Sequence, residues 1–217
     1  MRKGEQKKPK QSYIAYAPPY FGSRELGETW SSDPEKVVGR VMVTSLYALT
    51  DDFTKQYLLL KFKIIRVKGN VCETLFYGHE YGREFLRSLV RRGSTRIDGI
   101  FDVETRDGFK MRIQATVFTI NRVSHSRQKA VRKVMKQVIE EAAQRLTHDQ
   151  LAQEMVLGKT ASDIFNLVKK IVLPRNAGII KSKVLKIPDE LLKEPVQQMV
   201  TQPTTQKESE QPTPPAQ

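Results

Sequence analysis

The sequence predicts an α+β fold, and three observations support this class. Residues 12–122 contain successive runs in which apolar and polar residues alternate, as in strands with one buried face. From residue 124 the apolar residues recur at helical spacing, as in amphipathic helices. A β-branched run at 179–187 indicates one returning strand. Strands that precede helices, rather than alternating with them, are typical of α+β proteins.

The first strands are predicted from alternation. One half-buried face would consist of Val41, Val43, Ser45, Tyr47 and Leu49. Residues 58–64 repeat the pattern, with Lys61 and Lys63 on the opposite side. Gly69-Asn70 predicts a turn before a third strand at 71–77.

A short helix and a hairpin follow. The helix is expected near 81–92, with Phe85, Leu86 and Leu89 buried. The hairpin would pair residues 97–103 with 109–117 around Asp107-Gly108. Asp-Gly between alternating runs favours a type I′ turn, which needs a positive φ at both central residues.

The C-terminal half predicts three helices. In the first helix the apolar stripe comprises Val131, Val134, Met135, Val138, Ile139, Ala142 and Leu146. The second helix would begin at Thr147 with Gln150 completing a capping box, and the third at Thr160 with Asp163 in the matching place. The last strand, 179–187, would be closed by Pro188.

Composition divides the chain into three parts. Residues 1–11 predict a disordered basic arm, residues 12–188 a single α+β RNA-binding domain, and residues 189–217 a disordered tail rich in Pro and Gln. The chain has 217 residues and a net charge of +13. The tail holds two Lys against five acidic residues, a net charge of −3, which leaves residues 1–188 at +16.

Several classes of protein are disfavoured. A single cysteine, Cys72, excludes an intrachain disulfide framework, and the three histidines lack a metal-binding spacing, so we expect no metal and no cofactor. No apolar run approaches the roughly 18 residues that span a bilayer, and the N-terminus lacks the apolar stretch of a signal peptide. We therefore expect a cytoplasmic protein with neither a membrane nor a small-molecule substrate as partner.

The distribution of cations indicates a nucleic-acid partner. Residues 122–136 hold six cations and no acid, and the cations would lie opposite the apolar stripe. Like charges on one helix face repel each other by a few tenths of a kcal/mol per pair, so an anionic ligand is expected to offset that cost. The candidate RNA-binding residues are Arg2, Lys3, Lys7, Lys8, Lys10, Arg83, Arg87, Arg91, Arg92, Arg127, Lys129, Arg132, Lys133, Lys136, Lys169, Lys170, Arg175, Lys181 and Lys183.

Aromatic residues beside the basic arm allow two interpretations. Tyr13, Tyr16, Tyr20 and Phe21 could stack on exposed bases. The favoured interpretation is that most of them anchor the arm to the folded core, with one or two touching RNA.

No catalytic residues are predicted. Gly158-Lys159-Thr160 resembles the end of a phosphate-binding loop, but position 153 is Gln where that loop needs Gly. Asp98, Asp102 and Glu104 share one strand face, and pairing with Arg96, Lys110 and Arg112 is the simpler account of them.

Taken together, these segments resemble the S3Ae (eS1) family of small-subunit ribosomal proteins of archaea and eukaryotes, in its shorter archaeal form. The similarity is collinear over roughly residues 5–188, and the tail lies outside it. The segments that carry it are the arm leading into 13–21, then 38–46, 61–63, 78–80, 87–92, 157–159 and 181–188.

The resemblance implies a β-barrel-like core of about six to seven strands packed against helices. It also implies a structural role, without enzymatic activity, on the platform of the small subunit near the 3′ end of its rRNA and the mRNA exit. Expected partners are small-subunit rRNA, neighbouring ribosomal proteins on the platform, and mRNA near the exit.

Two alternatives to a structural constituent of the small ribosomal subunit remain open. A free-standing RNA chaperone or translational regulator would bind RNA away from ribosomes. An RNA-processing enzyme would need carboxylates converging in a cleft, and pairing of Asp98, Asp102 and Glu104 with cations on an exposed sheet would exclude it.

Overall fold

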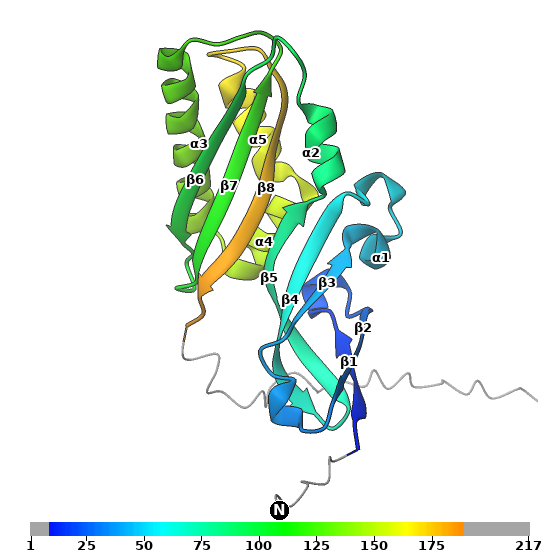
Figure 1. Ribbon diagram of the computed structural model, residues 1–217. Helices are drawn as coiled ribbons and strands as arrows, with labels where there is room; N and C mark the ends of the chain where they lie inside the picture. The colour runs from blue at the N-terminus through cyan, green and yellow to red at the C-terminus, as the bar shows by residue number, and fades with distance from the viewer. Residues whose placement is uncertain (1–8, 189–217) are drawn as a thin grey trace, which may run out of the picture.

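The computed structural model describes residues 9–188 and confirms the α+β class (Figure 1). The strands are β1 Gln11–Tyr16, β2 Glu25–Ser31, β3 Val41–Ser45, β4 Leu58–Lys68, β5 Val71–Tyr81, β6 Arg96–Glu104, β7 Lys110–Thr119 and β8 Pro174–Lys186. The helices are α1 Leu46–Thr50, α2 Arg83–Leu89, α3 His125–Arg145, α4 His148–Leu157 and α5 Lys159–Val168. A short helix lies among the strands, and the returning strand β8 follows the C-terminal helices, as expected.

The eight strands form one open sheet organised around β5. Along one edge β5 pairs with β4, whose other edge carries β3. The opposite edge of β5 is shared, because β1 pairs with it in parallel at residues 71–73 and β8 pairs with it at Glu80. The strand order is β2-β1-β5-β8-β7-β6. Within residues 9–188 no pairing returns β6 to β2 or β3, so the expected barrel-like core of six to seven strands is corrected to an open, eight-stranded sheet.

Two N-terminal strands account for the larger strand number. β1 and β2 pair antiparallel from Gln11, opposite Ser31, to Tyr16, opposite Glu25. The side chain of Tyr13 is buried, and Tyr20 and Phe21 pack against the main core. The anchoring role expected for the aromatic segment is therefore confirmed for these three residues, although no individual strand was delimited within the first part of the strand-rich region 12–122.

The alternating run from 41 to 49 is a strand only as far as Ser45. The Ser45 hydroxyl then accepts a hydrogen bond from the amide of Ala48 and caps α1. The chain turns at this point, so Leu46 and Leu49 are buried while Val43 is 55% exposed. The prediction of one continuous strand with a single half-buried face was wrong.

The predicted hairpin forms between β6 and β7, with Phe101 opposite Ile113 and Glu104 opposite Lys110. Its turn is not type I′. Among residues 9–188 the only non-glycine residues with a positive φ are Ser23 and Asp51, so the φ of Asp107 is not positive. Instead the amide of Thr105 donates to Phe109 O, which leaves a loop of three residues, 106–108. Gly108 has φ +77°, and its amide donates to Thr105 O. A type I turn followed by a left-handed glycine is the usual geometry of three-residue hairpin loops.

Helices α3, α4 and α5 cover one face of the β6–β7–β8 part of the sheet, and the opposite face is uncovered in the described residues (Figure 1). The stripe predicted on α3 is largely buried: Val131, Met135, Val138, Ile139 and Ala142 belong to the main core, and Val134 and Leu146 pack against it. Because the stripe takes one side of α3, the cations on its other side face solvent.

Helices α4 and α5 differ in how they begin. Thr147 and Gln150 form the predicted capping box of α4. The capping box predicted for Thr160 and Asp163 is absent, because α5 begins at Lys159 and its N-cap is Gly158. Gly158 has φ +92° and also ends α4, so one left-handed residue serves both helices. The last strand begins at Pro174, five residues before the predicted start.

Candidate nucleic-acid interface

The exposed side of α3 carries five of the candidate cations. Arg127, Lys129 and Lys133 are exposed and have no acidic partner within residues 9–188. Arg132 donates from Nε to Asp98 O at 2.9 Å, which fixes its side chain against β6. Lys136 Nζ lies 3.5 Å from Glu140 Oε1, so its charge is partly compensated. The helix therefore presents three uncompensated cations and two that also contact the protein.

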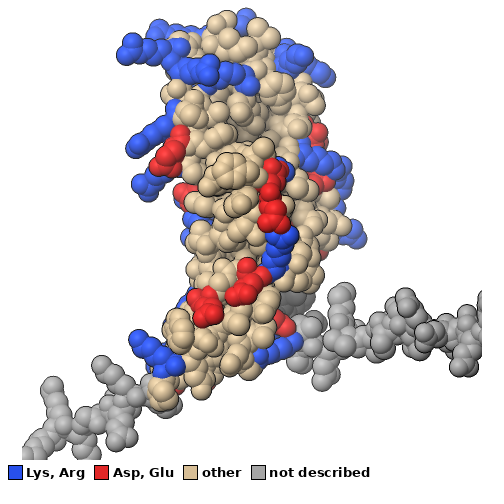
Figure 2. All heavy atoms as spheres, turned by 90° about the vertical axis from the view of Figure 1, so that its right-hand side faces the viewer, with Lys and Arg blue, Asp and Glu red and all other residues tan. Residues whose placement is uncertain are grey.

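A second group lies at the end of the molecule where α3 begins and α5 ends. Figure 2 shows Lys and Arg gathered at the upper end of the face on the side of α2, whereas acidic residues appear lower on that face. A cavity of about 230 Å³ opens there, lined by Arg122 and Arg127 from one segment and by Lys169 and Lys170 from another. The sequence nominated Arg127, Lys169 and Lys170 separately, without indicating that they meet.

Helix α2 and the turn after it carry four exposed arginines, Arg83, Arg87, Arg91 and Arg92. The expectation that Phe85, Leu86 and Leu89 would be buried beneath them is only partly met, because all three are half-buried. Phe85 stacks on Tyr57 with ring centroids 3.7 Å apart.

Arg175 differs from the other described candidates because it is partly buried. Its Nη2 donates to Leu89 O and so ties the C-terminal end of α2 to the start of β8. Arg175 therefore holds two elements together, whatever else its remaining N–H groups contact.

The uncovered sheet face brings Lys181 and Lys183 of β8 beside residues of β4 and β5. Lys183 Nζ and Lys63 Nζ lie 6.0 and 5.8 Å from the ring centroid of Tyr77. Lys181 Nζ lies 3.5 Å from Glu80 Oε2. Lys63 and Tyr77 were not predicted as functional residues, because only the strand pairing places them next to β8.

The basic arm is described only at its end. Lys10 is exposed directly before β1. The other arm candidates, Arg2, Lys3, Lys7 and Lys8, lie outside the described residues.

The acidic residues of β6 are paired with cations. Asp102 accepts two hydrogen bonds from Arg112, at 2.7 and 2.8 Å, and Asp98 Oδ2 lies 3.0 Å from Arg96 Nε. Glu104 Oε2 lies 3.7 Å from Lys110 Nζ. The Arg112 guanidinium lowers the pKa of Asp102 below its usual value. Carboxylates that are paired with cations on an exposed sheet are unavailable as a general acid and base. These pairs therefore exclude the alternative that the chain is an RNA-processing enzyme using these carboxylates.

Two histidines are buried and have structural roles. His79 Nε2 lies 2.9 Å from Ile179 O, and a carbonyl only accepts, so Nε2 carries the proton and Nδ1 accepts from Ser182 Oγ at 2.8 Å. Burial lowers the pKa of His79 to about 4. The neutral ring thus joins β5 to β8, and it is inaccessible to RNA.

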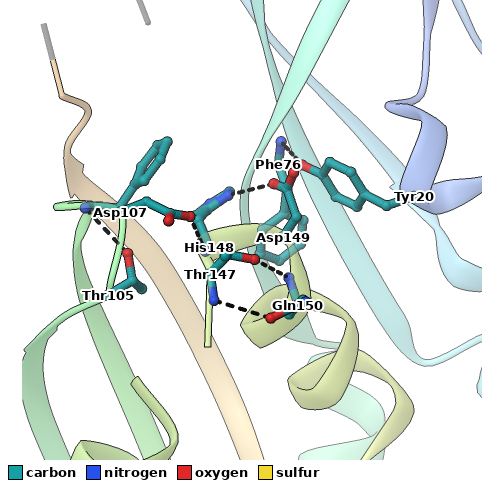
Figure 3. Close-up of polar contacts among 9 residues, drawn as sticks. Tyr20, Phe76, Thr105, Asp107, Thr147, His148, Asp149 and Gln150 are labelled. Carbon is teal, nitrogen blue, oxygen red and sulfur yellow. Dashed lines mark hydrogen bonds and ion pairs between the residues drawn. The ribbon is translucent and has the colours of Figure 1, made fainter. Parts of the chain in front are cut away.

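His148, the first residue of α4, lies at the centre of a polar cluster (Figure 3). Its amide donates to Asp107 Oδ2 at 3.0 Å, its Nδ1 lies 3.0 Å from Asp149 Oδ1, and its ring stacks on Phe109. Burial, reinforced by the charge of Asp149, raises the pKa of Tyr20 above its usual value. These contacts attach α4 to the β6–β7 loop.

Residues 9–188 lack two further kinds of feature. No group of three or more His, Cys, Asp or Glu side chains in this range could hold a metal ion. No helix among these residues is long and apolar enough to cross a membrane.

Comparison with known proteins gives a consistent result. The model of the Ribosomal S3Ae family matches residues 1–188. "Small ribosomal subunit protein eS1" of Desulfurococcus amylolyticus is 43% identical over 181 residues, covering 83% of this chain and 85% of the relative. The protein of the same name from Saccharolobus islandicus is 42% identical over 187 residues, covering 86% and 90%. That from Staphylothermus marinus is 42% identical over 179 residues, covering 82% and 84%.

Proposed function

The chain belongs to the ribosomal S3Ae family, and from this premise we propose that it is a structural constituent of the small ribosomal subunit that binds folded rRNA and supports translation. It is a structural component and not an enzyme. The observation that carries the proposal is the match of residues 1–188 to the family model, together with 43% identity over 181 residues to a relative named as a small-subunit ribosomal protein.

The proposed mechanism is neutralisation of RNA phosphates by cations held on a rigid scaffold. Exposed cations that lack acidic partners, such as Arg87, Lys129 and Lys133, are free to replace counterions on the RNA backbone. The affinity should therefore fall steeply with salt, by a slope of about 0.7 to 0.9 per phosphate contacted. Residues 12–188 would act as one RNA-binding domain, with the arm, 1–11, adding further cations and the tail, 189–217, lying outside it.

Among the candidate cations the contacts suggest two roles. Those without acidic partners would contribute mainly through their charge. Arg132 and Arg175, which also bond to backbone carbonyls, would position elements of the interface and contribute less to the salt dependence.

We propose a position on the platform of the cytoplasmic small subunit, near the 3′ end of the rRNA and the mRNA exit, with neighbouring ribosomal proteins in contact. Exposed apolar side chains support a protein-facing surface: Trp30 is 59%, Val43 55% and Phe53 70% exposed. A neighbouring protein that covers these side chains would remove their apolar surface from water, which favours association.

Sedimentation tests the function. The tagged full-length protein, expressed in cells of its source, should co-sediment with small subunits in a low-salt gradient and be released as salt is raised. Migration free of small subunits at low salt would contradict the proposal. Sequence-tolerant RNA binding at micromolar affinity, with no association with subunits, would instead indicate the chaperone or regulator.

A further inference from the structure

The cavity between the start of α3 and the end of α5 has an unusual lining. Its cations are Arg122, Arg127, Lys169 and Lys170, and its remaining walls are aliphatic side chains, Thr119 and Asn121. Among residues 9–188, no acidic or aromatic residue lines it. A nucleobase would lack a stacking partner there, whereas an anionic oxygen would meet donors from two sides.

The charges in the cavity are not compensated by the protein. None of the four cations pairs with an acid within residues 9–188. The surrounding sequence also lacks acids, since none occurs from residue 120 to 139 or from 164 to 188. Four cations facing one cavity of about 230 Å³ repel each other, and a shared anion would relieve that repulsion.

The walls are held in place before any ligand binds. Thr119 Oγ1 accepts from Thr95 N at 3.0 Å and donates to Asn121 O at 2.6 Å, which fixes the loop that carries Arg122. The amide of Ile120 donates to Leu173 O at 3.1 Å and joins this loop to the segment after α5. A ligand would therefore have to order the side chains of the four cations, but not the loop that carries Arg122.

We propose that this cavity holds a single phosphate group of the rRNA backbone, bound jointly by the four cations. The inference rests on the proposed function and adds to it a specific site. Arginine supplies paired donors to phosphate oxygens, and lysine supplies point charge, so the two segments complement each other. The cavity has room for the phosphate with adjoining backbone atoms or waters, since one water occupies about 30 Å³.

The salt dependence of rRNA binding distinguishes a shared site from a diffuse patch. The slope of log K against log salt counts phosphates neutralised, at about 0.9 each for a duplex. If one phosphate is shared, the variant Arg122→Gln/Arg127→Gln/Lys169→Gln/Lys170→Gln should lower the slope by about 1. Four independent contacts would lower it by about 4, and a fall of about 2 or more, or no fall, would overturn the inference.

A double-mutant cycle gives a second measurement with less risk to folding. For a shared phosphate, Arg122→Gln and Lys170→Gln combined should weaken binding by clearly less than the product of their separate effects. Effects that multiply would contradict a shared site. Lys133→Gln combined with Lys183→Gln, two distant cations, should multiply and so calibrates the cycle. Lys36→Gln, whose Nζ already lies 2.6 Å from Asp33 Oδ2, should leave the slope unchanged.

The outcome separates the two proposals. Wild-type protein that fails to bind the rRNA transcript of its own organism, at salt concentrations from 50 to 200 mM, contradicts the proposed function. Wild-type binding with an unchanged slope in the fourfold variant contradicts only the phosphate site.

Discussion

At the scale of single residues, Gly78 is required by a close approach of two strands. A Cβ built at this position would lie 2.2 Å from Ser182 O, and Gly78 has φ +154°. Ser182 belongs to β8, so any side chain at 78 would push β8 away from β5. Both atoms nearest to the added Cβ are backbone atoms, which cannot rotate away.

We therefore expect Gly78→Ala to lower the free energy of unfolding by about 3 kcal/mol or more, measured by urea denaturation. Gly22→Ala is the matched control, because Gly22 also has a positive φ but nothing lies within 4 Å of an added Cβ. It should cost only the backbone strain, about 1 kcal/mol. Equal losses in the two variants would contradict the close-approach explanation.

His79 makes stability depend on pH. Its pKa is lowered from 6.5 to about 4 in the folded state, so the unfolded chain binds the proton more readily. Stability contributed by the neutral ring is complete above pH 6.5 and is lost as the pH falls from 6.5 towards 4. At pH 5 the loss from this residue should be about 2 kcal/mol relative to pH 7.

Denaturant unfolding at several pH values measures this loss. His79→Gln should be less stable at pH 7 and should lose most of the dependence between pH 7 and 5. His125→Gln, at an exposed position, should keep it. An unchanged pH profile in His79→Gln would show that other groups cause the dependence.

At the scale of elements, α4 and α5 share the sequence pattern of a capping box, but only α4 forms one. Near the start of each helix the sequence has a Thr followed three positions later by a polar residue: Thr147 and Gln150 for α4, and Thr160 and Asp163 for α5. Thr147 caps α4, whereas the Thr160 hydroxyl is buried and has no hydrogen-bond partner among the described residues. Gly158 already occupies the N-cap of α5, so Thr160 falls within the first turn.

Thr147→Ala should therefore lower the free energy of unfolding by about 1 kcal/mol, because the amide of Gln150 loses its acceptor, the Thr147 hydroxyl. Thr160→Val is the matched control. It replaces a buried hydroxyl without a partner by a methyl group and should leave stability unchanged or raise it. Thermal and urea unfolding of both variants measure the difference, and a large loss in Thr160→Val would mean that its hydroxyl has a partner.

Elements also show where periodicity misleads. The apolar stripe of α3 is long enough to define its buried face, and the structure confirms it. The shorter run from 41 to 49 fits a strand and a helix turn equally well, and the Ser45 cap decides between them. Strand β1 has a buried Tyr13 and Ala15 at alternate positions, but its pairing with β5 depends on a segment over 50 residues away.

At the scale of the whole molecule, the interface depends on where cations gather and not on their number. Lys129→Glu/Lys133→Glu/Lys136→Glu should impair incorporation into small subunits while leaving the isolated fold intact, because all three side chains are exposed. Incorporation is measured as the fraction of tagged protein in the subunit peak, and circular dichroism checks the fold.

The matched control reverses three exposed lysines that already have acidic partners, in Lys36→Glu/Lys68→Glu/Lys159→Glu. The net charge changes equally in both variants. Incorporation should be reduced much less in the control. Equal impairment would mean that net charge alone governs binding, and unfolding of the α3 variant would mean that its face is misassigned.

Features that depend on near neighbours in the chain could be predicted from the amino-acid sequence. These are the α+β class, the hairpin at Asp107-Gly108, the buried stripe of α3, the cap at Thr147, and, through collinear similarity, the family. Other features became visible only in the folded chain: the sheet is open, β5 shares one edge between β1 and β8, and Arg122 and Arg127 line the same cavity as Lys169 and Lys170. The periodicity of apolar residues indicates which side of a helix or strand is buried, but it does not indicate which distant element covers that side.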